Sequence, residues 1–232
     1  MTAASAPLEL KNQKKQAQKL NNIRIQNRGK ALKSNDIIMI TASADDVGIN
    51  KWELAQRLGI ARDYSNELIE KCTARLKKHI KYKCVYIRTD VDMHEENICD
   101  FGFMRIPSRN LYRNLDGCRE AFVMAMTAGI NVDRELNRLK IISQAEYFVT
   151  DGIASAAIDS FADYAVKMMK GDKKCPPRFS PGYGDLSLSF QVPLLERLNA
   201  HGLLGITLDS ACLMTPMKSI TAIMGIKNEK DN

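Results

Sequence analysis

The stretch Arg178-Phe-Ser-Pro-Gly-Tyr-Gly-Asp185 lies between two segments with helical patterns and is typical of a ligand-binding loop. Pro181 fixes its own φ angle, whereas Gly182 and Gly184 can adopt positive φ angles or let a ligand approach the main chain. Arg178 offers a planar set of donors that suits a carboxylate or a phosphate. On composition alone an ordinary surface turn is the commoner explanation, because Pro-Gly and Gly-x-Gly turns occur throughout soluble proteins.

The segment before this loop has the pattern of a long helix over residues 151–169. Its apolar side carries Ile153, Ala157, Ile158, Phe161, Ala165 and Met168. Small residues in its first turns, from Gly152 to Ala157, would let another backbone or a ligand come close. Polar residues recur every four positions on another side: Asp151, Ser155, Asp159 and Asp163. This polar stripe is either solvated or part of a binding site.

The segment after the loop predicts one helix and two strands. Ser187 or Ser189 can begin a helix that continues to Ala200 and ends at Gly202, with Pro193 in its first turn. The residues expected to face inward are Leu188, Val192, Leu195 and Leu198. Strands are expected over residues 204–208 and 219–226, the second with Ile220, Ala222, Met224 and Ile226 on one side.

Two helices are expected near the start of the folded region. Asn50 and Glu53 have the spacing of a capping box, and Gly59 is placed to end the helix that follows. A second helix is expected over residues 65–79, where apolar side chains recur on one face.

The middle of the chain predicts a mixture of strands and helices. The β-rich runs 83–88 and 98–106 are expected to pair with each other. A helix is expected over residues 116–127, capped by its first residue and ended by Gly129, and Asp133 is expected to cap the next helix. No repeated βαβ pattern is present. The sequence therefore predicts an α+β fold, with a mainly antiparallel twisted sheet and helices packed on it.

The composition is that of a soluble globular protein. The chain is 45% hydrophobic and 26% charged, and its 232 residues are long enough to bury one sizeable core. No apolar run approaches the roughly 18 residues that a membrane helix needs, and no apolar signal segment follows the first basic residues. We therefore expect no membrane contact and a cytoplasmic location. The six cysteines lie far apart without a C-x-x-C pair, which favours small buried side chains over a zinc site.

The positive charge of the chain is concentrated at its start. Residues 1–36 hold eight Lys or Arg residues against Glu9 and Asp36, a net charge of +6 out of +7 for the whole chain. We interpret 1–36 as a basic arm and 37–232 as the folded domain. The arm could contact RNA or an acidic partner, but a solvated, partly helical arm is favoured. It lacks interleaved aromatics for base stacking, so nucleic acid is not the expected partner.

Two motifs in order resemble a known family. The loop from Arg178 to Tyr183 has the pattern Arg-x-x-x-Gly-Tyr, and Met214-Thr-Pro-Met-Lys-Ser219 has the pattern Met-x-Pro-x-x-Ser. Together they resemble the activation domain of cobalamin-dependent methionine synthase, here in a free-standing form. In that family the first motif binds S-adenosylmethionine and the second lies in a strand-turn-strand. A looser likeness extends from about Ile49 to Ile226.

The resemblance implies a binding site for S-adenosylmethionine formed by Arg178, Ser180, Gly182, Tyr183 and Asp159. Arg178 would bind the ligand carboxylate with both arms of its guanidinium, Ser180 would meet the adenine through its backbone, and Tyr183 would form an amphipathic wall. Asp159 aligns with an acidic residue, usually glutamate, that binds the ligand ammonium. Aspartate is shorter, so Asp163 one turn on is the alternative.

The resemblance also implies a repair function. The family domain docks over the cobalamin of its partner and presents the methyl group of S-adenosylmethionine, while flavodoxin or a similar donor supplies one electron to inactive cob(II)alamin. As a separate chain, this protein would act in trans on a methionine synthase or another corrinoid protein. Such a methyl transfer needs no general base.

Two other classes of function stay open from the sequence. One is a stand-alone S-adenosylmethionine-dependent methyltransferase, although the chain lacks the Gly-rich turn after a first strand that doubly wound methyltransferases carry. The other is a non-catalytic adaptor that uses its basic arm to hold a partner.

Overall fold

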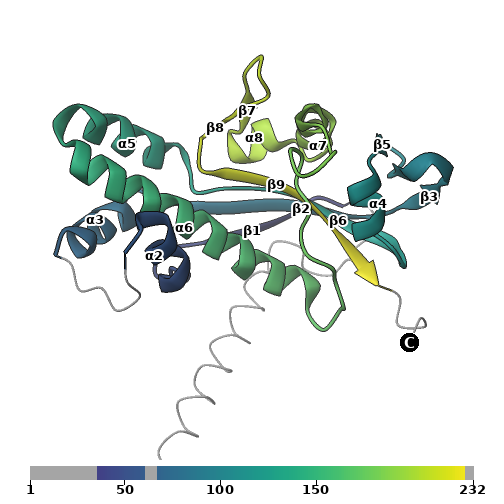
Figure 1. Cartoon of the computed structure of the whole chain (residues 1–232), viewed down its shortest axis with the longest axis horizontal. Helices are drawn as coiled ribbons and strands as arrows, with labels where there is room; N and C mark the ends of the chain where they lie inside the picture. Colours follow the sequence, from purple (N-terminus) through teal and green to yellow (C-terminus); the bar gives the residue numbers. More distant parts are fainter. Residues whose placement is uncertain (1–35, 61–66, 228–232) are drawn as a thin grey trace, which may run out of the picture. The chain divides into compact units, whose positions relative to one another are not determined.

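A four-stranded antiparallel sheet forms the centre of the structure, a computed structural model that describes residues 36–60 and 67–227 (Figure 1). Its strands follow the order β1-β2-β6-β9. Their bounds are β1 Ile38–Ala42, β2 Tyr82–Asp90, β6 Cys118–Thr127 and β9 Ser219–Lys227. The central strands are apolar toward both faces, since each face is covered by other elements.

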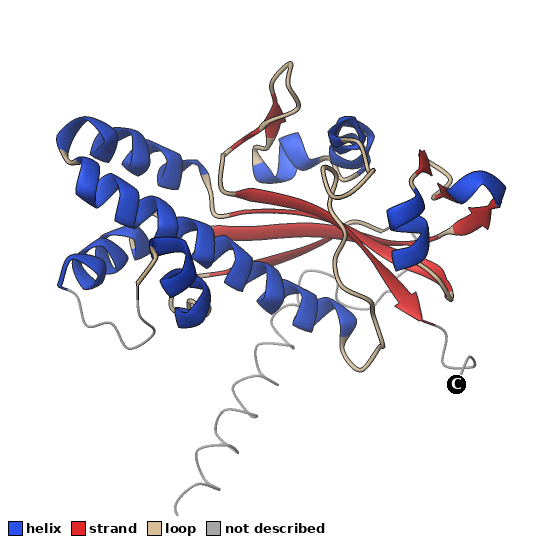
Figure 2. Cartoon of the chain, in the orientation of Figure 1, coloured by secondary structure: helices blue, strands red, loops and turns tan. Residues whose placement is uncertain are grey.

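Helices cover one face of this sheet (Figure 2). They are α2 Lys51–Leu58, α3 Glu67–Lys77, α5 Ile130–Ile142 and α6 Gln144–Lys170. The long helix α6 runs along the sheet and buries Phe161 against Tyr82 of β2, with ring centroids 4.5 Å apart. This packing fixes the side of α6 that carries Asp159 and Asp163.

Shorter elements cover the opposite face, in a second buried cluster that includes Val85, Val123 and Ile223. The helices there are α4 Arg109–Asn114, α7 Gln191–Arg197 and α8 Ala200–Leu204, with one-turn 3₁₀ helices at Glu95–Asn97 and Leu188–Phe190. A small sheet is formed by β3 Asp92–His94, β4 Ile98–Asp100 and β5 Arg105–Pro107, and a hairpin by β7 Thr207–Leu208 and β8 Met214–Thr215.

The α+β fold and two of the predicted helices are confirmed. The side chain of Asn50 accepts from the N–H groups of Trp52 and Glu53 at the start of α2, and Gly59 ends this helix with φ 64°. Helix α6 begins earlier than predicted, at Gln144, because Ser143 caps it by accepting from the Glu146 N–H at 3.3 Å. Helix α3 ends at Lys77, and its predicted first residues lie outside the described part of the chain.

The small residues early in α6 accommodate a neighbouring helix. A Cβ atom added at Gly152 would lie 2.7 Å from a terminal methyl group of Leu58 in α2. The close approach that the sequence predicted at Gly152 is therefore made by α2.

The predicted pairing of residues 83–88 with 98–106 is wrong. Strand β2 pairs with β1 and β6, whereas 98–106 divides into β4 and β5. The turn between them contains Gly102 at φ 79°, which only glycine adopts readily. A run of β-prone residues thus forms a hairpin of its own.

The helix predicted over 116–127 is also wrong, because Cys118–Thr127 is the central strand β6. Its run Ala121–Met126 is buried along its whole length and divides between the two clusters. Gly129 precedes α5 instead of ending a helix. Asp133 lies inside α5, where its carboxylate accepts from the Met217 N–H at 2.8 Å.

The helix predicted over 187–200 is interrupted. Helix α7 carries Pro193 in its first turn as expected, but Asn199 adopts φ 48° and separates it from α8. Gly202 lies within α8, which ends at Leu204 with Gly205 as its cap. The strand predicted over 204–208 is therefore reduced to Thr207–Leu208, which is β7. Val192 was expected to face inward and is 40% exposed.

Three other expectations concern the chain as a whole. The six cysteines are free thiols, and Cys72, Cys84, Cys99 and Cys118 are buried as predicted. Residues 1–35 lie outside the described residues, so the basic arm and its boundary stay predictions. Within the ranges 36–60 and 67–227, no helix combines the length and the apolar character needed to cross a membrane.

Candidate functional site

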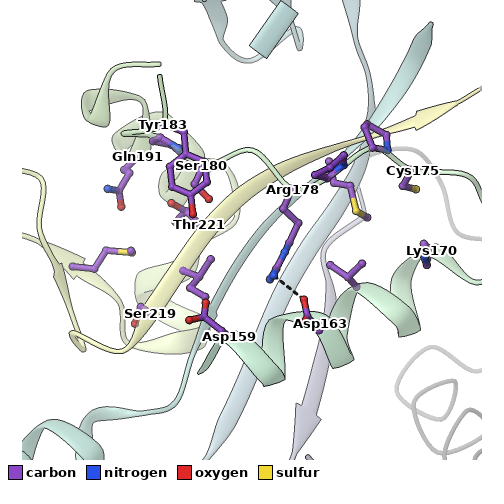
Figure 3. Close-up of a pocket in the computed structure, with 17 residues that line it drawn as sticks. Asp159, Asp163, Lys170, Cys175, Arg178, Ser180, Tyr183, Gln191, Ser219 and Thr221 are labelled. Atoms are coloured by element: carbon purple, nitrogen blue, oxygen red, sulfur yellow. Dashed lines mark hydrogen bonds and ion pairs between the residues drawn. The ribbon is translucent and has the colours of Figure 1, made fainter. Parts of the chain in front are cut away.

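The predicted ligand loop follows α6 and lies along the free edge of β9. Phe179 and Ile223 exchange two backbone hydrogen bonds of 2.8 Å, and the Lys227 N–H donates to the Lys174 carbonyl at 2.9 Å. Because side chains alternate in extended backbone, Phe179 packs into one cluster and Arg178 points the other way, toward α6 (Figure 3). The sheet edge therefore sets the direction of Arg178.

The loop then turns sharply through two glycines. Gly182 and Gly184 have φ angles of 93° and 53°. The turn is closed by hydrogen bonds from the Tyr183 N–H to the Ser180 carbonyl at 3.0 Å and from the Gly182 N–H to the Leu186 carbonyl at 2.8 Å. The sequence motif is thus a structured turn, which holds Ser180 and Tyr183 in place.

Asp185 ties the end of the loop to α4. Its carboxylate accepts from the Ser108 hydroxyl and from the N–H groups of Arg109 and Asn110. The hydrogen bond from Ser108 has the largest effect, and together with the two from the backbone it holds the pKa of Asp185 below its ordinary value. The loop is therefore anchored at both ends, by β9 and by α4.

A cavity of about 610 Å³ lies between α6, the loop, β9 and the start of α7. Its volume falls within the roughly 300–1,000 Å³ that is common for small-molecule sites. It is lined by Asp159, Asp163, Val166, Lys170, Cys175, Pro176, Pro177, Arg178, Ser180, Pro181, Tyr183, Gln191, Met214, Ser219, Ile220, Thr221 and Met224. The structure thus brings together Arg178, Ser180, Tyr183 and Asp159. Gly182 is not among the lining residues and shapes the turn instead.

Arg178 is the central cation of this cavity. One guanidinium nitrogen, Nη2, donates to Asp163 at 2.8 Å, and the other, Nη1, is buried without a hydrogen-bond partner among the described residues. The Arg178 side chain is 24% exposed, whereas that of Asp163 is 71% exposed. Since a buried donor without an acceptor is costly, Nη1 is available for a ligand. Only one terminal nitrogen of the guanidinium, Nη1, is therefore free for a ligand, whereas the sequence suggested that both would bind it.

Asp159 belongs to a charged cluster on the wall of the cavity. Its carboxylate is ion-paired with Arg57 of α2, which also binds Glu53 at 2.9 Å. Burial of Asp159, followed by the neighbouring Glu53, raises its pKa to about 6, although Arg57 and Arg178 act in the opposite direction. Two carboxylates share one arginine here, so a further cation is electrostatically favoured.

Several residues at or beside the cavity could not be recognised from the sequence. Glu53 and Arg57 have the spacing of an ordinary helix ion pair, and nothing in the sequence connects them with Asp159 about a hundred residues later. Gln191 begins α7 and is 4% exposed. Its Nε2 donates to the Cys212 carbonyl at 3.3 Å, and its Oε1 is buried without a partner among the described residues.

The second sequence motif also reaches the cavity. Met214 and Ser219, its first and last residues, are both lining residues. The Ser219 hydroxyl donates to the Pro216 carbonyl at 2.7 Å and so closes the turn before β9. The two motifs, distant in sequence, therefore meet at one site.

Comparison with known proteins supports the fold and adds no sequence relative. No protein-family model matches the chain. No curated protein matches its sequence. Among solved structures, the chain is similar to a crystal structure of the MetH reactivation domain bound to AdoHcy, with a TM-score of 0.63 and 11% sequence identity. The match covers 87% of this chain and 81% of that chain, and it shows a shared α+β fold.

Proposed function

We propose that this protein binds S-adenosylmethionine in the Arg178 cavity and acts in trans in the reductive remethylation of cob(II)alamin. The client would be a cobalamin-dependent methionine synthase or a related corrinoid protein in the cytoplasm, and flavodoxin or a similar donor would supply the electron. Two observations support this proposal. The fold is shared with the MetH reactivation domain bound to AdoHcy, and both sequence motifs of that family line one cavity here.

The unpaired Nη1 of Arg178 is the observation that carries the proposal. A buried guanidinium nitrogen in a cavity of this size is suited to an anionic ligand group. S-adenosylmethionine has one such group, its α-carboxylate. Asp163 would keep the other arm of the guanidinium in place, so that the free arm is presented without a loss of side-chain entropy.

Asp159 provides the matching anionic group in the cavity wall, with Glu53 and Arg57 beside it. With both carboxylates ionised, the three side chains carry a net negative charge, which would attract the α-ammonium of the ligand. An amino-acid zwitterion needs a cation and an anion at a fixed separation. Arg178 and Asp159 are such a pair, because β9 positions the first and α6 the second.

The adenosine part of the ligand would lie toward Tyr183 and Ser180. The Tyr183 ring is 57% exposed and packs edge-to-face on Phe179, with ring centroids 5.9 Å apart. It can therefore cover a flat ligand group while one side stays accessible. The Ser180 carbonyl already accepts from the Tyr183 N–H and has a second lone pair.

When bound, S-adenosylmethionine would supply an electrophilic methyl group to the corrinoid of the client after its one-electron reduction, and would be left as S-adenosylhomocysteine. The residues of this chain would bind and orient the ligand, since methyl transfer from a sulfonium requires no proton transfer. The exposure of Tyr183 is consistent with an acceptor that belongs to another protein.

The proposal is tested first by binding and then by reactivation. Isothermal titration calorimetry should show saturable binding of S-adenosylmethionine to the full chain. Next, a methionine synthase without its activation domain is prepared as cob(II)alamin and mixed with reduced flavodoxin, S-adenosylmethionine and this protein. The absorption spectrum should convert to that of the methylated cofactor only when all components are present.

The controls separate this function from its alternatives. Arg178→Ala should abolish the conversion, and omission of S-adenosylmethionine should do the same. Absence of binding in calorimetry would refute the proposal at its first step. Methyl transfer to a small molecule or to RNA without any corrinoid protein would instead support a stand-alone methyltransferase.

A further inference from the structure

Gln191 is a buried polar residue whose role the proposed function does not yet explain. It begins α7 on the face of the sheet opposite α6, yet it lines the same cavity as Arg178. In Figure 3 Gln191 lies on the Tyr183 side of the cavity, and the Arg178–Asp163 ion pair lies on the α6 side. The two ends of the cavity therefore carry different polar groups.

The amide of Gln191 is held in one orientation. Its Nε2 donates to the Cys212 carbonyl, and the opposite orientation would place two acceptor oxygens together. Its Oε1 is left buried without a partner, and Gln191 is the one side-chain amide among the residues that line the cavity. The free group at this end is thus a neutral acceptor of fixed direction.

Two unpaired buried atoms of opposite kind belong to residues that line one cavity. Of the five such side-chain atoms within the described residues, Arg178 Nη1 and Gln191 Oε1 belong to residues that line it, the first a charged donor and the second a neutral acceptor. A ligand that satisfies both must carry an anion at one end and a hydrogen-bond donor at the other. In the proposed ligand, the 6-amino group of adenine is such a donor at the end remote from the carboxylate.

We infer that Gln191 accepts a hydrogen bond from the 6-amino group of adenine and so selects an adenine base over bases with a carbonyl oxygen at that position. This inference rests on the proposed function, since it assigns one end of the ligand to S-adenosylmethionine. It makes Gln191 a specificity-determining residue. A base with a 6-carbonyl oxygen would place an acceptor against Oε1 and leave both unpaired.

The test compares S-adenosylhomocysteine with S-inosylhomocysteine, in which a carbonyl oxygen replaces the 6-amino group. Calorimetry with the full chain should show that the adenine compound binds more tightly by roughly tenfold to a hundredfold, the usual effect of leaving buried polar groups unpaired. Gln191→Met has a side chain of similar length without the acceptor. It should reduce this ratio to about one, mainly through weaker binding of S-adenosylhomocysteine.

A matched control is the same substitution at an exposed glutamine. Gln56→Met on α2 should keep the wild-type ratio. If Gln191→Met fails to fold, Gln191→Asn replaces it, since this change withdraws the amide by one methylene group and should also lower the ratio.

The outcomes distinguish this inference from the proposed function. Equal affinity of the wild-type protein for the two compounds, or an unchanged ratio in the Gln191 variants, would overturn the role of Gln191 and leave ligand binding intact. If the wild-type protein binds neither compound, the proposed function fails, and the inference fails with it.

Discussion

At the residue scale, Arg178 should contribute most to ligand binding. We expect Arg178→Ala to raise the Kd for S-adenosylmethionine at least about thirtyfold, which corresponds to about 2 kcal/mol for loss of a charge-assisted contact. Arg178→Lys should recover only part of this loss, because an ammonium lacks the planar fork that serves Asp163 and the ligand together. Calorimetry measures both variants.

The same variants allow a simple check of folding. Arg178→Ala removes the ion pair between Arg178 and Asp163. Because the Asp163 side chain is 71% exposed, water can solvate it in the variant, and the melting temperature should change little. Unchanged ligand affinity in a folded Arg178→Ala variant would place the carboxylate elsewhere.

The two acidic residues of α6 should differ in their effect on binding. Asp159 lies in the shared cluster with Glu53 and Arg57, whereas Asp163 is an exposed partner of Arg178. We therefore expect Asp159→Asn to raise the Kd for S-adenosylmethionine, by less than Arg178→Ala does. Asp163→Asn should leave it nearly unchanged, because the amide oxygen of Asn can still accept from Nη2 of Arg178. The reverse order, measured by calorimetry, would move the ammonium site one turn along the helix.

The raised pKa of Asp159 predicts a pH dependence of binding. Since this pKa is about 6, the carboxylate should be lost as the pH falls from 7.5 to 5, and the affinity for S-adenosylmethionine should fall with it. In Asp159→Asn the Kd should vary less over this range. A pH profile that is the same in both proteins would contradict the role of Asp159 in binding.

The same pKa shift has the opposite consequence for stability. The folded state binds the proton of Asp159 more tightly than the unfolded state does, so stability linked to this group increases as the pH falls through about 6. Asp159→Asn should therefore melt higher at pH 7.5, by roughly 2–4 °C for each 1 kcal/mol gained. The gain should vanish near pH 4, which differential scanning calorimetry can measure.

At the scale of elements, the glycine turn should be sensitive to any side chain. Gly184 has φ 53°, and a Cβ atom there would overlap with the side-chain amide of Asn110. We expect Gly184→Ala to cost about 1–2 kcal/mol from backbone strain alone, with an added cost for displacing Asn110. Gly117→Ala is the control for backbone strain alone. Gly117 also has a positive φ, of 70°, but an added Cβ atom there would have no neighbour within 4 Å.

The measurement is thermal unfolding together with ligand affinity. Gly184→Ala should melt lower than Gly117→Ala and should also weaken S-adenosylmethionine binding, since the turn holds Tyr183 in the cavity wall. A Gly184→Ala protein with wild-type stability and affinity would show that the loop tolerates another conformation.

The predictability of each element depended on local signals. Helix α2 was recognisable because Asn50 and Gly59 cap its ends, and β9 because the apolar residues Ile220, Ala222, Met224 and Ile226 recur at every second position, with Thr221 and Gly225 between them. Strand β6 was missed because both of its faces are buried, which removes the alternation and leaves an apolar run compatible with a helix. Only the tertiary environment distinguishes these two structures.

The site was predictable to a similar extent. Arg178, Ser180 and Tyr183 lie in one contiguous motif, whereas Asp159 was proposed from the resemblance, because helical spacing alone gives a polar stripe that could equally be solvated. Gln191 reaches the cavity from α7, and Arg57 of α2 pairs with Glu53 and with Asp159 beside the cavity. No sequence motif connects these three residues with the loop. The sequence therefore located the loop, whereas the electrostatic partner of Asp159 and the free acceptor of Gln191 required the structure.

At the scale of the whole molecule, the cavity should function without the start of the chain. Residues Ser34–Asn232 form one compact unit, and among the described residues those that line the cavity or pair with Asp159 belong to it. We expect deletion of residues 1–33 to leave the Kd for S-adenosylmethionine within about twofold of the wild-type value, which is below about 0.5 kcal/mol. Calorimetry on both proteins makes this comparison.

The same deletion tests the adaptor alternative and the use of the basic segment in docking. If the deleted protein binds S-adenosylmethionine normally but no longer supports reactivation, the segment serves contact with the corrinoid protein, because basic side chains there would steer association with an acidic surface. Loss of ligand binding would contradict a self-contained cavity. If instead the full chain holds RNA or an acidic protein through these residues and binds no S-adenosylmethionine, the adaptor alternative is correct, since the affinity of an adaptor would come from the charge of its arm.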